Sequence, residues 1–259
     1  MTKLSANLGF LWTELPLTEA IRAAANAGFD AVECHWPFET PAEIIKSTLL
    51  ETNLGMLSLN TSRGNEKKGE FGICAFPDRV SEAREAIQQA VNYAVAIDAK
   101  AVHVMPGKAA GIDGAMECFL DNLGYAATLA DKFGLEILIE PINREDIPGY
   151  FLADMETAVE IVRKLKRANI KIMFDCYHIQ KIHGELRDRL ERNLDIIGHI
   201  QIAAYPSRHE PDEGDVDYPD FLKWLDALGY AGYVGAEYKP RTTTDAGLDW
   251  IDLLRRQGE

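Results

Sequence analysis

Four polar side chains stand at or near the ends of apolar runs in the second half of the sequence, and all four carry oxygen. Glu140 follows "LEILI", Asp175 follows "IKIMF" and Glu237 follows "YVGA". The fourth, Gln201, lies within "HIQI", where a buried amide costs free energy unless it has a partner. Carboxylate and amide oxygens with water suit Mg²⁺ or Mn²⁺ better than zinc. If these side chains meet, they predict a divalent-metal site.

Convergence of the three carboxylates would itself require a counter-charge. Carboxylates that share a partly buried site repel one another, and some take up protons unless a cation neutralises them. A divalent ion that chelates both oxygens of an α-hydroxy carbonyl compound stabilises an enediolate, while carboxylates remove and return the carbon-bound proton. Glu140 and Glu237 could flank such a substrate, with Asp175 and Gln201 holding the metal from between.

The elements that must position these side chains alternate regularly between strand and helix. The predicted strands are 4–11, 31–36, 55–62, 101–107, 135–143, 170–178, 197–203 and 232–239. The predicted helices are 16–29, 41–53, 79–97, 115–133, 154–166, 184–194, 218–229 and 245–256. The strands are near-continuous apolar runs, which is typical of parallel strands buried on both faces.

Eight such units predict a single (β/α)8 TIM barrel domain over residues 1–259. The alternative, a doubly wound open sheet, usually carries a glycine-rich phosphate fingerprint after its first strand, and "NLGFLWTELP" has none. Active sites of TIM barrels lie at the carboxyl ends of the strands, which is where the four oxygen-bearing side chains fall.

Three histidines stand near the predicted site. His178 follows Asp175 by three residues, and either a substrate contact or a structural hydrogen bond fits its position. His103, in "AVHVMPG", has the same two readings. His199 shares a side of its strand with Gln201, so we expect it to support that residue.

A substrate carboxylate would need a cation. Arg208, Arg144, Lys239 and Arg63 all follow predicted strands and are the candidates. The polar, glycine-containing loop 63–77 could close over the substrate as a lid or remain an exposed loop.

Composition excludes several other classes of protein. The 259-residue chain has a net charge of −14, so we expect no nucleic-acid partner. We see no signal-peptide pattern and no apolar run long enough for a membrane span, which predicts a cytoplasmic protein without a membrane partner. The four cysteines contain no CxxC pair and are expected to be reduced. Whether identical chains associate stays open.

Several motifs occur in an order that resembles the hydroxypyruvate isomerase family, within the wider xylose isomerase-like TIM barrel group. These motifs are "EPIN", "DIPGY", "FDCYH", "GHIQIA", "RHEPDEGDVDY" and "GYVGAEYKP". Towards the amino terminus, "ANLGFLWTELPL", "NAGFDAVECHWPF" and "LNTSRGNEKKGEFG" also fit, so the resemblance covers nearly the whole chain. "LNTSRGN" is more similar to the 2-oxo-tetronate isomerase branch.

The resemblance implies a Mg²⁺- or Mn²⁺-dependent aldose–ketose isomerase of a small 2-oxo acid. The substrate would be hydroxypyruvate, converted to tartronate semialdehyde, or a 2-oxo-tetronate. It implies that Glu140 and Glu237 are metal ligands as well as proton donor and acceptor, and that Arg208 contacts the substrate. Gln201 stands where ketose epimerases have histidine, and Asp146 where they have glutamate, which favours the oxo-acid branch. The resemblance also makes Asp146 a candidate for substrate binding.

Alternatives remain at this point. A sugar epimerase or an inosose-type dehydratase would use the same metal set. An endonuclease IV-like phosphodiesterase shares the barrel, but it needs several metals and many histidines, whereas this chain is acidic and has six histidines. A barrel that keeps its metal without catalysis is the last alternative, and the four intact strand ends argue against it.

Overall fold

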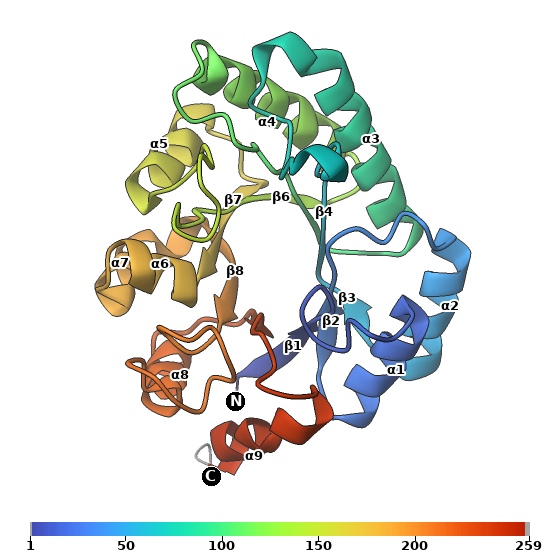
Figure 1. The fold of residues 1–259 in the computed structure, drawn as a ribbon, viewed down its shortest axis with the longest axis vertical. Helices are drawn as coiled ribbons and strands as arrows, with labels where there is room; N and C mark the ends of the chain where they lie inside the picture. The colour runs from blue at the N-terminus through green and yellow to red at the C-terminus, as the bar shows by residue number, and fades with distance from the viewer. Residues whose placement is uncertain (1, 257–259) are drawn as a thin grey trace.

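The computed structural model describes residues 2–256, whose strands form one parallel sheet ringed by helices (Figure 1). The strand order is β3-β2-β1-β9-β8-β7-β6-β5-β4. The strands are β1 (Lys3–Asn7), β2 (Ala31–Glu33), β3 (Gly55–Met56), β4 (Ser58–Asn60), β5 (Ala101–His103), β6 (Glu136–Ile139), β7 (Ile170–Asp175), β8 (Ile197–Ile202) and β9 (Tyr233–Ala236).

The sheet closes into a barrel because β3 and β4 are two halves of one strand, interrupted only at Leu57. β3 pairs with β2, and β4 pairs with β5. Across the break, the amide of Leu57 donates to the carbonyl of Val32 at 2.8 Å, and the amide of Asn60 donates to the carbonyl of His35 at 2.8 Å. Counted as one strand, β3 and β4 complete the eight predicted strands, so the barrel fold is confirmed.

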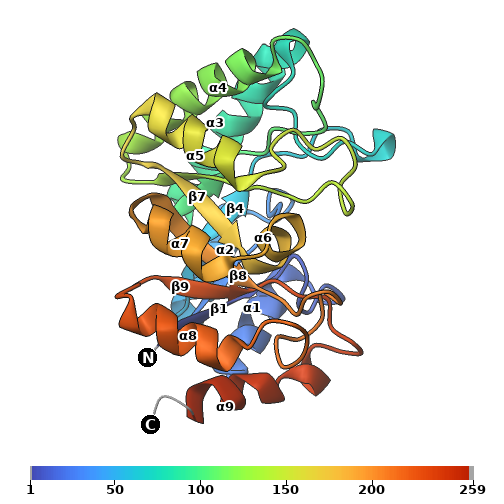
Figure 2. The same ribbon diagram turned by 90° about the vertical axis from the view of Figure 1, so that its left-hand side faces the viewer.

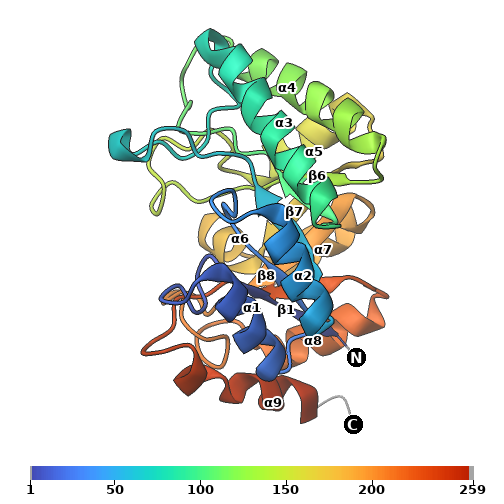
Figure 3. The same ribbon diagram turned by 90° about the vertical axis from the view of Figure 1, so that its right-hand side faces the viewer.

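The helices cover the outside of the barrel, as views from two opposite sides show (Figures 2 and 3). They are α1 (Leu17–Asn26), α2 (Ala42–Thr52), α3 (Val80–Ala96), α4 (Ala115–Asp131), α5 (Met155–Leu165), α6 (Cys176–Ile182), α7 (Leu186–Asn193), α8 (Tyr218–Ala227) and α9 (Asp249–Arg256). Among the described residues, no helix is both long and apolar enough to cross a lipid bilayer. All four cysteines are buried free thiols, as expected.

Every predicted strand extends further at its carboxyl end than the strand in the structure, and the predicted helices are also longer than those observed. Three boundaries illustrate the differences. The strand expected over 170–178 ends at Asp175, because the Asp175 side chain accepts a hydrogen bond from the amide of Tyr177 and thereby caps α6. The helix expected over 184–194 is α7, which begins at Leu186. The strand expected over 4–11 ends at Asn7, where the backbone turns: the amide of Leu11 donates to the carbonyl of Asn7.

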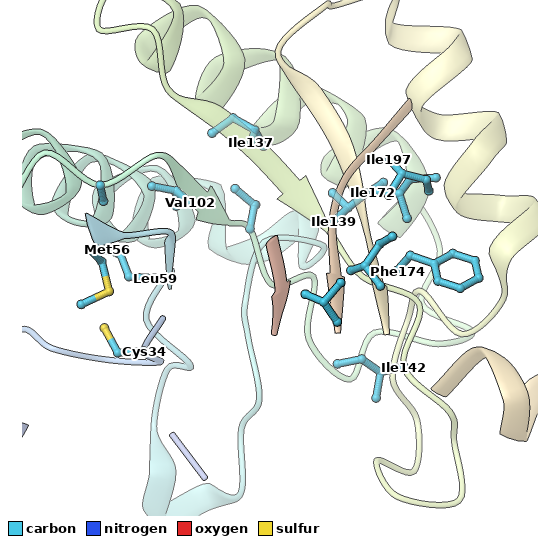
Figure 4. Close-up of a cluster of buried hydrophobic side chains, with 14 of the residues drawn as sticks. Cys34, Met56, Leu59, Val102, Ile137, Ile139, Ile142, Ile172, Phe174 and Ile197 are labelled. Carbon is cyan, nitrogen blue, oxygen red and sulfur yellow. The ribbon is translucent and has the colours of Figure 1, made fainter. Parts of the chain in front are cut away.

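Strand residues alternate between two environments. Ile137, Ile139 and Ile172 belong to the large buried cluster between the strands and the helices (Figure 4). Leu138 instead packs with Ala101 inside the barrel. Because the period is two residues, the next inward positions along each strand lie at the carboxyl end. Those positions are polar, namely Asn7, Glu33, Asn60, His103, Glu140, Asp175, Gln201 and Glu237.

Candidate active site

A cavity of about 390 Å³ opens at the carboxyl end of the barrel. Polar residues from the strand ends line it, including Asn7, Glu33, Asn60, His103, Glu140, Gln201 and Glu237. Aromatic and cationic side chains from the loops complete the lining, among them Phe10, Trp36, Phe71, Arg63, Arg208 and Lys239. A concave site with converging polar groups is the arrangement expected of an enzyme that binds a small polar molecule.

The four predicted metal ligands come from four adjacent strands. Glu140 directly follows β6, Glu237 directly follows β9, and Asp175 and Gln201 are register partners on β7 and β8. Within the part of the chain that the structure describes, three of their oxygens are buried without a hydrogen-bond partner: Glu140 Oε1, Asp175 Oδ2 and Gln201 Oε1. Buried polar atoms are nearly always paired, so these unpaired acceptors fit a bound cation.

The carboxyl groups perturb one another. Burial, together with the charges of Glu237 and Asp175, raises the pKa of Glu140 well above its usual value. Burial raises the pKa of Glu237 to about 8, although Arg208 favours the charged form. Burial also raises the pKa of Asp175, again with Arg208 opposing the shift. Such pKa shifts are common at functional sites, because these sites often hold several groups of like charge in a buried space.

Glu237 differs from Glu140 in having both oxygens held. Asn7 Nδ2 donates to Glu237 Oε2 at 2.8 Å, and Arg208 Nη2 donates to Glu237 Oε1 at 3.1 Å. Glu140 has only weak neighbours, with Oε2 lying 3.7 Å from His103 Nδ1 and Oε1 lying 3.8 Å from His178 Nε2. The predicted pair of glutamates is therefore asymmetric in its surroundings.

Gln201 is held by a residue that the sequence reasoning missed. Its Nε2 donates to Glu33 Oε2 at 2.8 Å, and Glu33 also accepts from Ser5 and contacts His199. Burial alone would raise the pKa of Glu33, but His199, Ser5 and Gln201 outweigh burial and lower it. The buried amide of Gln201 thus has a protein partner on its nitrogen side and none on its oxygen side.

His178 lies against the carboxylates, and one ligand atom each from Glu140, Asp175 and His178 fall within 4.8 Å of one another. Asn143 Oδ1 accepts from the amide of Asp146, which leaves Asn143 Nδ2 to donate to His178 Nδ1 at 2.7 Å. Burial lowers the pKa of His178 well below its usual value. The neutral ring therefore carries its hydrogen on Nε2, which faces the site as a donor.

The guanidinium group of Arg208 contacts two aromatic rings. Its Cζ lies 4.7 Å from the ring centroid of Phe10 and 4.9 Å from that of Tyr177. Its Nη1 lies 3.4 Å from Asp146 Oδ2, while its Nε is buried and has no hydrogen-bond partner in residues 2–256. Asp146 lines the cavity but is bound at 2.8 Å by Lys181. Asp146 thus anchors two cations at the edge of the site, and Arg208 keeps one donor free.

Of the remaining predicted site residues, some line the cavity and one does not. His103 lines the cavity, and no described residue forms a hydrogen bond with its Nε2. Arg63 and Lys239 also line it, and Arg63 stacks on Trp36 with its guanidinium carbon 4.0 Å from the ring centroid. Arg144 is not among the lining residues and donates to a backbone carbonyl.

The loop 63–77 runs along the cavity and then away from it. Arg63 and Phe71 contribute to the lining. The short turn Glu66–Lys68 between them projects from the barrel (Figures 2 and 3). Glu70 forms an ion pair with Arg79 at 2.9 Å, so its role within the chain is to tie this loop to the next helix.

Comparison with known proteins agrees with this geometry. The chain is 40% identical over 255 residues to a 2-oxo-tetronate isomerase of Pectobacterium atrosepticum, a match that covers 97% of each chain. It is 37% identical over 258 residues to a hydroxypyruvate isomerase of Escherichia coli, covering 98% of this chain and 100% of that one. A crystal structure described as an AP endonuclease of family 2 from Brucella melitensis has a TM-score of 0.94 and 37% identity, with 98% and 99% of the chains covered.

A family model matches most of the chain as well. It is described as a xylose isomerase-like TIM barrel, and the match runs over residues 21–254. The closed parallel barrel, the site at the carboxyl ends of its strands and this match lead to one conclusion: the chain belongs to the xylose isomerase-like TIM barrel family.

Proposed function

We propose that this protein is a divalent-metal-dependent isomerase that interconverts the aldose and ketose forms of a small 2-oxo acid. Two relatives that match nearly its whole length are named isomerases, one of 2-oxo-tetronate and one of hydroxypyruvate. The carrying observation is the set of unpaired buried atoms around the cavity. The acceptors are Glu140 Oε1, Asp175 Oδ2 and Gln201 Oε1, and Arg208 Nε is an unpaired donor.

These atoms fit a metal and an anionic substrate together. Glu140, Asp175, Gln201 and Glu237 would hold Mg²⁺ or Mn²⁺, since their donors are all oxygens. When bound, the ion supplies positive charge that stabilises the enediolate oxygens. The unpaired nitrogen of Arg208 would remain for the substrate carboxylate, which a planar guanidinium binds well.

The side chains of this chain would carry out the proton transfer. Glu140 and Glu237 approach from β6 and β9, on either side of Asp175 and Gln201, so they can reach the substrate from two directions. One takes the proton from the hydroxyl-bearing carbon next to the carbonyl, and a carboxylate returns a proton to the former carbonyl carbon. The hydroxyl proton passes to the former carbonyl oxygen, so the overall change is an isomerisation. His178 offers its Nε2 hydrogen to a substrate oxygen beside Glu140, which would keep the developing charge in place.

The test is isotope exchange in D₂O followed by NMR. Chelator-stripped protein is incubated with hydroxypyruvate, and separately with a 2-oxo-tetronate, with and without Mg²⁺ or Mn²⁺. We expect metal-dependent entry of deuterium at the carbon beside the carbonyl, together with formation of the isomer. The acid that reacts faster identifies the substrate, and the absence of exchange with both acids would contradict the proposal.

Two variants test the assigned carboxylates. Glu140→Gln and Glu237→Gln should each lower turnover by at least about a hundredfold, since each removes a proton carrier and a charged ligand. Glu136→Gln is the matched control, because Glu136 begins the same strand, β6, at the opposite end of the barrel. Near wild-type turnover in either test variant would refute the two-glutamate scheme.

A further inference from the structure

Glu33 is a buried acid beside the proposed metal site that the proposed reaction does not use. It is 1% exposed and lies on β2, whereas the four proposed ligands come from β6 to β9. Its two oxygens form hydrogen bonds with three side chains: Ser5 Oγ at 2.9 Å, His199 Nε2 at 3.0 and 3.1 Å, and Gln201 Nε2 at 2.8 Å. A buried carboxylate with this many hydrogen-bond partners is part of a satisfied polar network, which holds its members in fixed positions.

We infer that Glu33 is a positioning residue that fixes the side-chain amide of Gln201 with its oxygen toward the metal. This inference rests on the proposed function, because it requires Gln201 to be a ligand. An amide has two ends of nearly equal shape, and only the oxygen end can bind a cation. Something must therefore determine which end of Gln201 faces the site.

A carboxylate determines this orientation because it only accepts hydrogen bonds. Glu33 Oε2 can pair with the nitrogen of Gln201 but not with its oxygen. The reversed amide would set two acceptors against each other in a buried space and would turn its nitrogen toward the cation. The observed orientation leaves Gln201 Oε1 as a buried, unpaired acceptor, which is the atom that the metal would use.

The barrel leaves room for this contact at one glycine. Gly235 on β9 is the register partner of both Ser5 and Gln201. A Cβ at Gly235 would lie 2.1 Å from Glu33 Oε1, 2.9 Å from His199 Nε2 and 3.1 Å from Gln201 Cγ. The carboxylate therefore occupies the volume that a side chain at this strand position would fill.

The experiment measures Mn²⁺ binding by calorimetry, on chelator-stripped protein with no substrate present. Glu33→Gln replaces the acceptor by an amide, which can satisfy either orientation of Gln201. Glu33→Asp keeps the charge but withdraws the carboxylate by one methylene. Both should raise the Kd for Mn²⁺ by about 10–100-fold, the usual effect of removing a residue that orients a metal ligand.

Ser5→Ala is the control, because Ser5 donates to Glu33 Oε1 and leaves the bond between Oε2 and Gln201 in place. We expect its Kd to stay within about threefold of the wild type. Thermal melting of the stripped variants confirms that each is folded before its Kd is compared. A role in packing alone would shift the melting temperature without changing the Kd.

The outcomes separate the inference from the proposed function. If wild-type protein binds no Mn²⁺, the proposed function itself fails. If the wild type binds and both Glu33 variants bind equally well, only the positioning role is refuted. If Glu33→Gln binds more weakly while Glu33→Asp does not, Glu33 acts through its charge, and the inference of a fixed amide orientation is again overturned.

Discussion

Replacing Glu140 by glutamine should stabilise the metal-free protein. Glu140 is 4% exposed, its Oε1 has no hydrogen-bond partner among the described residues, and one of its oxygens lies within 4.8 Å of an Asp175 oxygen. At an effective dielectric constant of about 20, two unit charges at that separation repel each other by about 3 kcal/mol. Glutamine removes this repulsion and keeps the shape of the side chain.

The repulsion energy is an upper limit, because the folded wild type can relieve it by holding a proton. We therefore expect the free energy of unfolding to rise by about 2 kcal/mol, which corresponds to an increase of about 4–8 °C in melting temperature for a chain of this size. A change in this direction is unusual for a buried residue, since most substitutions destabilise a protein. It would mark Glu140 as a residue kept for function.

The gain should depend on pH. Because the pKa of Glu140 is raised in the folded chain, the unfolded chain binds fewer protons near neutral pH, so the stability of the metal-free wild type falls as pH rises above the ordinary glutamate range. The variant lacks this contribution. Its advantage should therefore be small at about pH 5 and larger at about pH 8.

The assay is thermal or urea unfolding of chelator-stripped proteins at both pH values. Glu160→Gln on α5 is the control for removal of one negative charge, since Glu160 is exposed. Adding Mn²⁺ should reverse the order, because the ion stabilises the wild type through a ligand that the variant has lost. A lower melting temperature for metal-free Glu140→Gln at about pH 8 would refute the electrostatic reasoning.

Three further results are expected. Arg208→Lys keeps the charge but loses the guanidinium that contacts the rings of Phe10 and Tyr177, so kcat/KM should fall by about 10–100-fold. Steady-state kinetics would test this, and near wild-type values would contradict it. Gly72→Ala should lower the free energy of unfolding by about 1–3 kcal/mol in a denaturation experiment, because φ is +102° and a Cβ would lie 2.6 Å from the carbonyl oxygen of Met105. The Kd for Mn²⁺ should decrease as pH rises from about 6 to 8, because carboxyl groups with raised pKa values must lose protons to bind metal. Calorimetry at both pH values would test this, and a Kd independent of pH would contradict it.

The barrel and the four candidate ligands could be predicted because both depend on local patterns. A buried parallel strand is a short apolar run, and the first acid after it falls at the carboxyl end of the barrel. This rule identified Glu140, Asp175 and Glu237 at the carboxyl ends of β6, β7 and β9, and the register of β7 with β8 brings Gln201 level with Asp175. Agreement between strand order and chain order over this half of the sheet made the convergence predictable.

The partners that orient these ligands were less accessible to prediction. Glu33 carries the same local signal, an acid after an apolar run in "AVE", but its contact with Gln201 spans 168 positions of the sequence. Asn143 gave no local signal, and its importance depends on the contact with His178. The end of β7 at Asp175 was missed, because a capping hydrogen bond overrides the apolar pattern that continues into α6.

The hydrogen bonds that orient the four proposed ligands are unevenly distributed among them. The amide of Gln201 is held by Glu33, both oxygens of Glu237 are held by Asn7 and Arg208, and Asp175 is held by a backbone amide. Within residues 2–256, the structure gives Glu140 no side-chain hydrogen bond, and the ring nitrogens of His103 and His178 lie 3.7 and 3.8 Å from its oxygens.

A carboxylate without donors gains most from a cation and also has the most freedom to accept a proton and release it. The same absence of partners that destabilises the metal-free fold would therefore suit Glu140 to exchange a proton with the substrate. Glu237 accepts a hydrogen bond at each oxygen, which favours its charged form, so it should take up a proton less readily than Glu140. If the proposed reaction is correct, the two glutamates should consequently differ in their effects, and Glu140→Gln should be the variant that gains stability as it loses turnover.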